Sequence, residues 1–526
     1  MTKSAWCYTL LLGGIAILGR VLLFPILPHP TPQVHDEFSY LLAANTFASG
    51  KLSSDPHPHF RFFETFHVLS RPRYMSKYPP GQAIVLAIGI ALGHPHNGVI
   101  LSFGLFVITT VWMLRSIVPL NWALFGGVWA LLTFNVHSYW LESYWGGFVA
   151  AIGGNLVLGS LLYGFHHHRR AMRWWFVAGT LILAVTRPFE GLALETATIA
   201  AFLIWRRFAN RSDFEKTVRQ WFAPAFVSVI VVAATLGAYN WLTLGSPSHM
   251  PYAEYEKQYG VVPVFWPLPL REELRFDDPT VERFYREWSI DVYHQTRDHH
   301  ALLLLPFQLL RIVLVGVLSV FGLSSTMIFA AIFCRRNTMI RVLGAALVGT
   351  SLFITLEVWI YPHYLAPLVS LLIALGVVSL HQIWAEIAAA QRVPYVLWIT
   401  VMLAMGSPVY HSVRFVLEAS REGTAHGTPP FEIRYRDDSR EEIQRTLEKM
   451  GGRHVVFIRY SSSHNMHDEW VYNSPDIDKQ PVIWARDRGE ENVELQTYYA
   501  GRTFWVIEPD MPSPERQLML VAASTQ

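Results

Sequence analysis

Long apolar stretches separated by short polar joints run through the chain as far as residue 410. The segments that approach the length of a membrane span lie at 6–27, 99–118, 122–136, 148–165, 174–186, 189–205, 222–244, 313–333, 342–361, 364–380 and 394–410. A helix needs roughly 20 apolar residues to cross a bilayer, whereas the strands of a membrane barrel alternate over about ten. The pattern therefore predicts an all-α polytopic membrane protein with about 11 transmembrane helices.

Two shorter apolar stretches, 79–92 and 301–310, adjoin polar loops and are typical of helices that lie at the membrane surface. A further surface helix is expected in the loop 29–78, with Gly50 as its end. Its apolar side chains recur at roughly helical spacing and are Phe38, Leu41, Leu42, Phe47 and Leu52. This loop is therefore expected to carry interfacial helices rather than to act as a plain connector.

The tail after residue 410 has a different pattern. Asp438 and Ser439 can cap a helix that continues to Met450, and three strand-forming runs follow at 455–460, 481–485 and 503–507. We therefore expect two domains. These are a transmembrane domain over 1–410 and a separate, small, soluble α/β domain over 411–526.

Composition supports the membrane interpretation. Hydrophobic residues make up 52% of the chain and charged residues 16%, at a mean hydropathy of +0.26, which exceeds what a soluble domain normally carries. The two cysteines, Cys7 and Cys334, predict no disulfide framework. The net charge of +2 says little about partners, and the bilayer rather than nucleic acid is expected as one of them.

Positive charge falls on one side of this helix map. The basic positions are Lys3, Arg115, 166–173, 206–219, 335–341 and Arg392. Because cytoplasmic loops are enriched in Lys and Arg, this side is expected to be cytoplasmic, together with the N-terminus and a retained first span. The opposite, outer side then holds the first outer loop 29–78, the second outer loop 246–300 and the C-terminal tail.

Acidic and basic side chains gather in the first outer loop. Asp36 and Glu37 precede the expected surface helix and Tyr40 lies within it, while Glu64, His67, Lys77 and Tyr78 follow before the turn at 79–80. One interpretation of the acidic pair is a helix N-cap with a favourable dipole interaction, worth about 1 kcal/mol. The other is catalytic, because a carboxylate can take a proton from a reacting hydroxyl.

Further charged residues fall at other joints on the outer side. Arg187 precedes Pro188 and Glu190 at an expected helix N-terminus, a position suited to an anion, although Arg187 could instead reach the headgroups or pair with Glu190. His363 follows the helix-breaking Pro362 and could bind phosphate or hydrogen-bond backbone. Near these joints lie three further residues that could line a substrate cavity, namely Glu142, Glu357 and Tyr361.

Arg20 lies well inside the first expected span. An unpaired charge there would cost at least about 2.5 kcal/mol, so Arg20 must face a partner or a cavity. Asn155 and Glu195 raise the same question. The second outer loop is rich in Tyr and Trp, which fits either sugar recognition or an interfacial aromatic belt.

The acidic pair Asp36-Glu37 after span one, the downstream Tyr40 and the turn at Pro79-Pro80 resemble the GT-C superfamily of membrane glycosyltransferases. The similarity is to the branch of protein O-mannosyltransferases and bacterial aminoarabinose transferases, a glycosyltransferase family 39-like pattern. It covers roughly residues 6–410. Tyr78 stands where that branch has the His of a His-Pro-Pro element, so the role of that His does not transfer.

The resemblance implies inverting transfer of a sugar from a polyprenyl-phosphate donor to an acceptor on the outer, periplasmic face of a bacterial inner membrane. The acceptor could be lipid, glycan or protein. In this interpretation Asp36 is the general base and Glu37 orients it, or the two exchange roles. The candidates for binding the donor phosphate are Arg187, His363, Lys77 and Arg20. The candidates for lining the substrate cavity are Tyr40, Glu64, His67, Tyr78, Glu142, Glu190, Glu357 and Tyr361.

No obligatory cofactor is expected. A divalent cation held by Asp36 and Glu37 with His67 or Glu64 stays open, since Arg187 and Lys77 could neutralise phosphate instead. Two other functions also stay open. One is a lipid or solute transporter, or a flippase, which would concentrate charge near the midplane of the membrane. The other is a non-catalytic scaffold that presents the C-terminal tail, which would not need Asp36, Arg187 and His363 to converge.

Overall fold

The computed structural model describes residues 3–166, 170–209, 211–271, 273–300, 337–390, 395–422, 439–512 and 516–521. Most of the described chain is a bundle of apolar helices. Its helices are α1 (Lys3–Val21), α4 (Pro95–Leu114), α5 (Leu120–Thr133), α6 (Phe148–His166), α7 (Trp174–Ala184), α8 (Pro188–Ala209), α9 (Arg211–Leu244), α15 (Thr338–Ile354), α16 (Val369–Ala389) and α17 (Tyr395–Glu422).

Six helices in the described part are long and apolar enough to cross a membrane, and they make the chain an integral membrane protein. They are α1, α4, α6, α8, α9 and the helix that continues through α16. The spans expected at 122–136, 174–186 and 342–361 correspond to the shorter apolar helices α5, α7 and α15. The span expected at 313–333 and the surface helix expected at 301–310 lie outside the described residues. The count of about 11 transmembrane helices therefore stays a prediction.

Helix α6 lies at the centre of the bundle and is almost wholly buried. The side chain of Asn155 in α6 donates hydrogen bonds to Thr110 Oγ1 at 2.9 Å and to Thr109 Oγ1 at 3.1 Å, both on α4. Interhelical hydrogen bonds of this kind hold helices together in a bilayer, where burial of apolar surface drives no association. The structure therefore gives Asn155 partners within the bundle.

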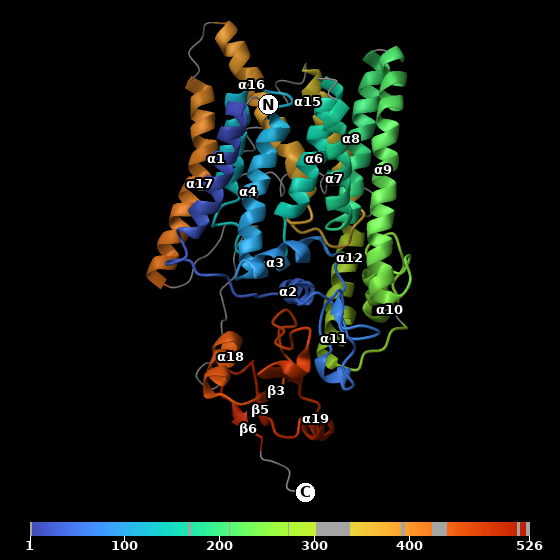
Figure 1. The fold of residues 1–526 in the computed structure, drawn as a ribbon, viewed down its shortest axis with the longest axis vertical. Coiled ribbons are helices and arrows are strands. Elements are labelled where there is room, and N and C mark those ends of the chain that lie inside the picture. The colour runs from blue at the N-terminus through green and yellow to red at the C-terminus, as the bar shows by residue number, and fades with distance from the viewer. Residues whose placement is uncertain are drawn as a thin grey trace.

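Short helices cover the end of the bundle that faces the C-terminal residues (Figure 1). Helices α2 (His35–Ala48) and α3 (Gly81–Ala91) lie across this end, and the 3-10 turn η1 (Phe60–Phe63) and the hairpin β1 (Val68–Leu69) and β2 (Met75–Ser76) connect them. The second outer loop adds α10 (Pro251–Tyr259), α11 (Pro279–Arg283), a π-helical turn (Phe284–Trp288) and α12 (Ser289–His300). Its buried Tyr255, Tyr259 and Tyr285 pack into one apolar cluster with Phe66.

Residues 439–512 and 516–521 form an α/β unit beyond α2 and α3, which we call the C-terminal unit (Figure 1). Its sheet has the order β4-β3-β5-β6, with β3 parallel to β4 and β5 and with β6 antiparallel. The strands are β3 (His454–Ile458), β4 (Val482–Arg486), β5 (Thr503–Ile507) and β6 (Met519–Leu520), accompanied by α18 (Ser439–Met450) and α19 (Asn492–Tyr498). β5 coincides with the run expected at 503–507, and β3 and β4 overlap the runs expected at 455–460 and 481–485, whereas α17 continues past the expected boundary at 410.

The C-terminal unit shares an apolar core with the first outer loop. Phe62 and Phe63 of the loop pack with Val455 and Phe457 of β3, and Leu42 of α2 belongs to the same cluster. A charged contact reinforces this core, because the buried Arg486 of β4 donates to the carbonyl of Glu64 at 2.6 Å. The sheet and the outer loop therefore bury apolar surface against each other.

Candidate active site

Asp36 lies in the first turn of α2, at the end of the bundle that faces the C-terminal unit. The hydroxyl of Tyr78 donates a hydrogen bond to Asp36 Oδ1. The same oxygen lies 3.6 Å from His67 Nε2, and Oδ2 lies 3.5 Å from His35 Nδ1. The Asp36 side chain is 21% exposed, so it is held by neighbours but still open to an incoming molecule.

Glu37 occupies a different position from its neighbour. Its Oε2 accepts hydrogen bonds from the backbone N–H groups of Gln33 and Val34, and its Oε1 accepts one from the N–H of Tyr144 at 3.0 Å. Burial raises the pKa of Glu37 to about 7, while these backbone donors lower it in part. Glu37 is thus the capping residue of α2 and joins this helix to the loop before α6.

A close backbone approach brings Tyr78 and Arg187 to the same end of the bundle. The N–H of Gly81, at the start of α3, donates to the carbonyl of Val185 at 2.7 Å. A Cβ atom at position 81 would lie 2.5 Å from Thr186 Cγ2 and 2.6 Å from that carbonyl oxygen. Only glycine fits here, because any side chain would push the turn at 78–80 away from the joint between α7 and α8.

Arg187 precedes the N-terminus of α8 and is mostly buried. Its guanidinium lies 3.6 Å from Glu190 Oε1 and 4.2 Å from the ring centre of Tyr364. Burial raises the pKa of Tyr40 and the nearby Arg187 lowers it in part, and the ring of Tyr40 stacks on that of Tyr78 at 4.6 Å. The guanidinium therefore borders the same group of side chains as Asp36.

The joint before α16 contributes His363 and Glu357. The hydroxyl of Tyr139 and His363 Nδ1 lie 3.0 Å apart, and the ring of His363 stacks on that of Tyr361. Burial lowers the pKa of His363 well below its ordinary value, and Arg187 lowers it further, so the imidazole is neutral. Glu357 is buried, and burial together with the nearby Glu190 raises its pKa well above the usual range, while Arg187 acts in the opposite direction.

Lys77 supplies a second cation near Asp36. Its ammonium lies 3.7 Å from Glu256 Oε1 of α10 and 4.6 Å from the ring centre of Tyr255. Burial lowers the pKa of Lys77, and the charges of Glu256 and Asp36 raise it in part. The N–H of His67 also donates to the hydroxyl of Tyr255 at 2.6 Å. Lys77 and His67 thus both link the first outer loop to the second.

Tyrosines connect the two cationic sides of the site. The ring of Tyr364 lies 4.2 Å from the Arg187 guanidinium and 4.7 Å from the ring of His363, while the ring of Tyr252 lies 4.9 Å from the Lys77 ammonium. Asp36 thus lies in one continuous polar cluster. The residues of the cluster that the sequence pointed to are Asp36, Tyr40, His67, Lys77, Tyr78, Arg187, Glu190, Glu357, Tyr361 and His363.

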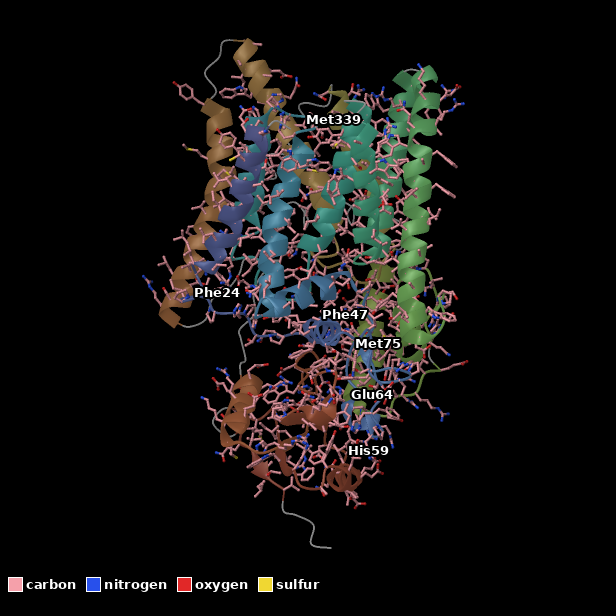
Figure 2. The ribbon with its side chains drawn as sticks, in the orientation of Figure 1. Phe24, Phe47, His59, Glu64, Met75 and Met339 are labelled. Atoms are coloured by element: carbon pink, nitrogen blue, oxygen red, sulfur yellow. The ribbon has the colours of Figure 1, made fainter. Side chains whose placement is uncertain are left out.

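Three candidates lie apart from this cluster. Arg20 is fully buried and binds both carboxylate oxygens of Glu142, at 2.5 Å and 2.8 Å, and also donates to the carbonyls of Leu27 and Pro28. Glu64 lies on the side of the first outer loop that faces the C-terminal unit (Figure 2) and accepts a hydrogen bond from Tyr259 at 2.6 Å. The structure therefore gives Arg20, Glu142 and Glu64 protein partners away from Asp36.

Several residues of the site were not among the sequence-derived candidates. His35 and Tyr364 adjoin residues that were, so their positions carried a weak signal. Glu256 lies in the second outer loop, where nothing in the sequence indicates which side chains face the first loop. Tyr252 of the same loop is one of the aromatic residues that fit either sugar recognition or an interfacial belt. His467 comes from the C-terminal unit and lies 3.4 Å from His35, a pairing across 432 positions that no local pattern predicts.

His35, Asp36 and His67 each present one ligand atom within 4.8 Å of the others. Two imidazoles and a carboxylate are donors that zinc and similar divalent cations accept. His35 Nδ1 and His67 Nδ1 are buried without a hydrogen-bond partner among the described residues. This group is where a cation would fit best in the part of the chain that the structure describes.

Comparisons with known proteins identify the fold. No family model and no curated protein matches the sequence. Among solved structures, ArnT from Cupriavidus metallidurans in the apo state aligns with a TM-score of 0.52 and 14% identity, covering 94% of this chain and 92% of that one. The same protein bound to undecaprenyl phosphate aligns with a TM-score of 0.50 and 13% identity, covering 97% and 94%. The chain therefore has the same fold as these ArnT structures, which agrees with the fold that the resemblance of its motifs implies.

Proposed function

We propose that this chain is a glycosyltransferase that moves a sugar from a polyprenyl-phosphate donor to an acceptor hydroxyl at the outer face of the membrane. The observation that carries the proposal is the position of Asp36, a partly exposed carboxylate at the end of an apolar bundle, in one polar cluster with Lys77 and Arg187. The aligned ArnT structure with undecaprenyl phosphate supports a lipid-linked donor.

The reaction requires few protein groups. Asp36 accepts the proton of the acceptor hydroxyl as its oxygen attacks the anomeric carbon, while the bond from that carbon to the phosphate oxygen breaks. The electron pair stays with the phosphate, so the products are the glycosylated acceptor and polyprenyl phosphate. Attack opposite to the leaving group inverts the anomeric carbon.

Glu37 does not share the role of base in this proposal. Its two oxygens already accept three backbone hydrogen bonds, and turning toward a substrate would leave these buried donors without partners. Asp36 has no such backbone partners among the described contacts, and Tyr78 orients it. We therefore assign proton abstraction to Asp36 and positioning of α2 to Glu37.

Cationic and aromatic groups on either side of Asp36 suit the donor phosphate. The Arg187 guanidinium is oriented by Glu190 and Tyr364, and a fork of N–H donors matches a phosphate better than a point charge does. Neutral His363 and the ammonium of Lys77 complete the set of donors. Buried charges of this kind stabilise the developing phosphate charge because they are already in place before the reaction.

A divalent cation is not required in this scheme, because Lys77 and Arg187 supply positive charge. Transfer is therefore expected to persist in excess EDTA. If EDTA abolishes transfer and zinc or manganese restores it, the cation would be assigned to His35, Asp36 and His67, and Asp36 would become a ligand rather than a base.

The alternative function is transport or flipping of a lipid without sugar transfer. We disfavour it because the charged cluster lies at the end of the bundle beside the C-terminal unit, whereas transporters place such groups near the midplane. The test uses purified protein in liposomes that contain a radiolabelled polyprenyl-phosphate sugar. A transferase makes a labelled acceptor and free polyprenyl phosphate, whereas a flippase moves intact label between leaflets and leaves the donor unchanged.

A further inference from the structure

Helix α2 is held between the membrane bundle and the C-terminal unit (Figure 1). Tyr40 and Ala44, four residues apart, pack into the core of the bundle. Phe38 and Leu42, also four residues apart, face the other way, where Phe38 stacks on Tyr472 at 4.2 Å and Leu42 joins the core under the sheet. The direction of the α2 N-terminus, and of Asp36 with it, therefore depends on contacts from both bodies.

The C-terminal unit also reaches the Asp36 cluster directly. His467 Nδ1 lies 3.4 Å from His35 Nε2, and the ring of His467 meets Trp288 edge-on at 4.8 Å. The other nitrogen of His35, Nδ1, faces Asp36 Oδ2 at 3.5 Å. The side chains thus form a row from the C-terminal unit to the proposed base.

We propose that His467 is a positioning residue for Asp36 and acts through His35, so that the C-terminal unit completes the active site. The proposal rests on the function assigned above. The His35 ring is buried between Phe66 and Phe284, which cannot fix its orientation by hydrogen bonding. A contact at Nε2 determines which way the ring faces, and a ring turned by 180° would no longer present Nδ1 to Asp36.

A second contact between the same two parts of the chain supplies a matched control. His57 of the first outer loop lies 3.2 Å from Asp478 Oδ1 and 3.0 Å from the hydroxyl of Tyr499, both in the C-terminal unit. His57 and His467 therefore both join the loop to this unit, but only His467 contacts a residue that faces Asp36.

The experiment compares H467A, H467N and H57A with the wild-type chain in the transfer assay, with thermal unfolding measured in detergent for each. We expect H467A to lower kcat about tenfold, as loss of one orienting hydrogen bond of about 1.4 kcal/mol would. The donor KM and the midpoint of unfolding should change little. Asparagine can present a polar atom where Nδ1 lies, so H467N should recover most of the rate, and H57A should stay within twofold of wild type.

Three outcomes would overturn the inference. These are a rate for H467A within twofold of wild type, an equal loss in H57A, or no recovery in H467N. Failure of the proposed function would look different, because the wild-type chain would then transfer no sugar or D36N would transfer at the wild-type rate.

Discussion

Tyr78 donates its hydroxyl to Asp36 Oδ1 and thereby joins the turn before α3 to the first turn of α2. The ring of Tyr78 stacks on Tyr40, and burial raises the pKa of its hydroxyl well above the usual range, with Asp36 raising it further. The hydroxyl therefore stays protonated and acts as a donor to the carboxylate. This contact holds Asp36 Oδ1 in place, and either oxygen of the carboxylate can still accept a proton in the proposed reaction.

Replacement of Tyr78 by phenylalanine tests this orienting role. Y78F keeps the stacked ring and removes one hydrogen bond to a charged group, a loss of about 1.5–3 kcal/mol in general. We expect kcat to fall roughly tenfold to a hundredfold with little change in the donor KM. Y74F is the control, because the hydroxyl of Tyr74 contacts only the Asn473 carbonyl among the described hydrogen bonds. Equal rates for Y78F and Y74F would argue against the role.

Arg187 is expected to bind the donor phosphate. R187A should lower kcat/KM by about a hundredfold or more, since removal of one preorganised donor commonly costs two to three orders of magnitude. R187K keeps the charge but loses the fork of donors and should raise the donor KM with a smaller loss of rate. The measurement is initial rate against donor concentration, with R61K, an exposed arginine of the first outer loop, as control. An unchanged donor KM in both Arg187 variants would contradict the assignment.

The pair of Arg20 and Glu142 is expected to stabilise the fold. Removing one partner of a buried ion pair costs about 3–5 kcal/mol, because the other charge is left uncompensated. R20M should therefore lower the midpoint of thermal unfolding strongly, and the double variant R20M/E142Q should recover part of the loss. R414M, which breaks the exposed pair with Glu418, should change little. If R20M unfolds like wild type but raises the donor KM, Arg20 binds the donor instead.

The raised pKa of Glu37 predicts a pH dependence of stability. The native carboxyl keeps its proton up to about pH 7, whereas the unfolded carboxyl releases it near its ordinary value of 4.5. The native state then binds more protons in this window, so its stability falls as pH rises from about 4.5 to about 7 and levels off above. E37Q cannot titrate, and its stability should lack this slope of up to about 1.4 kcal/mol per pH unit. Parallel unfolding curves for the two proteins from pH 5 to pH 8 would contradict the shift.

The sequence points to those parts of the proposed site that local chemistry determines. An acidic pair before a surface helix, a cation before Pro188 and a histidine after Pro362 each carry a readable signal, and the structure brings Asp36, Arg187 and His363 into one polar cluster. The capping interpretation of the pair also holds for one of its members, since Glu37 accepts the backbone donors and leaves Asp36 for other contacts.

The remaining contacts depend on long-range pairing. Arg20 finds Glu142 across 122 positions and His35 meets His467 across 432, and neither separation follows from helix or strand periodicity. The packing of the C-terminal unit on the first outer loop is a further long-range contact. The sequence of β3 has the pattern of an ordinary strand. Its packing against Phe62 and Phe63 is visible only in the structure.

The role of Asp36 is tested by the rate of polyprenyl phosphate release by wild type, D36N and D55N at saturating donor, with donor binding measured in parallel. Asp55 is an exposed aspartate of the same loop, paired with Arg73. We expect D55N to match wild type, and D36N to bind donor normally but turn it over at least a hundredfold more slowly, as loss of a general base commonly gives. Turnover by D36N within threefold of wild type would show that Asp36 does not take the acceptor proton.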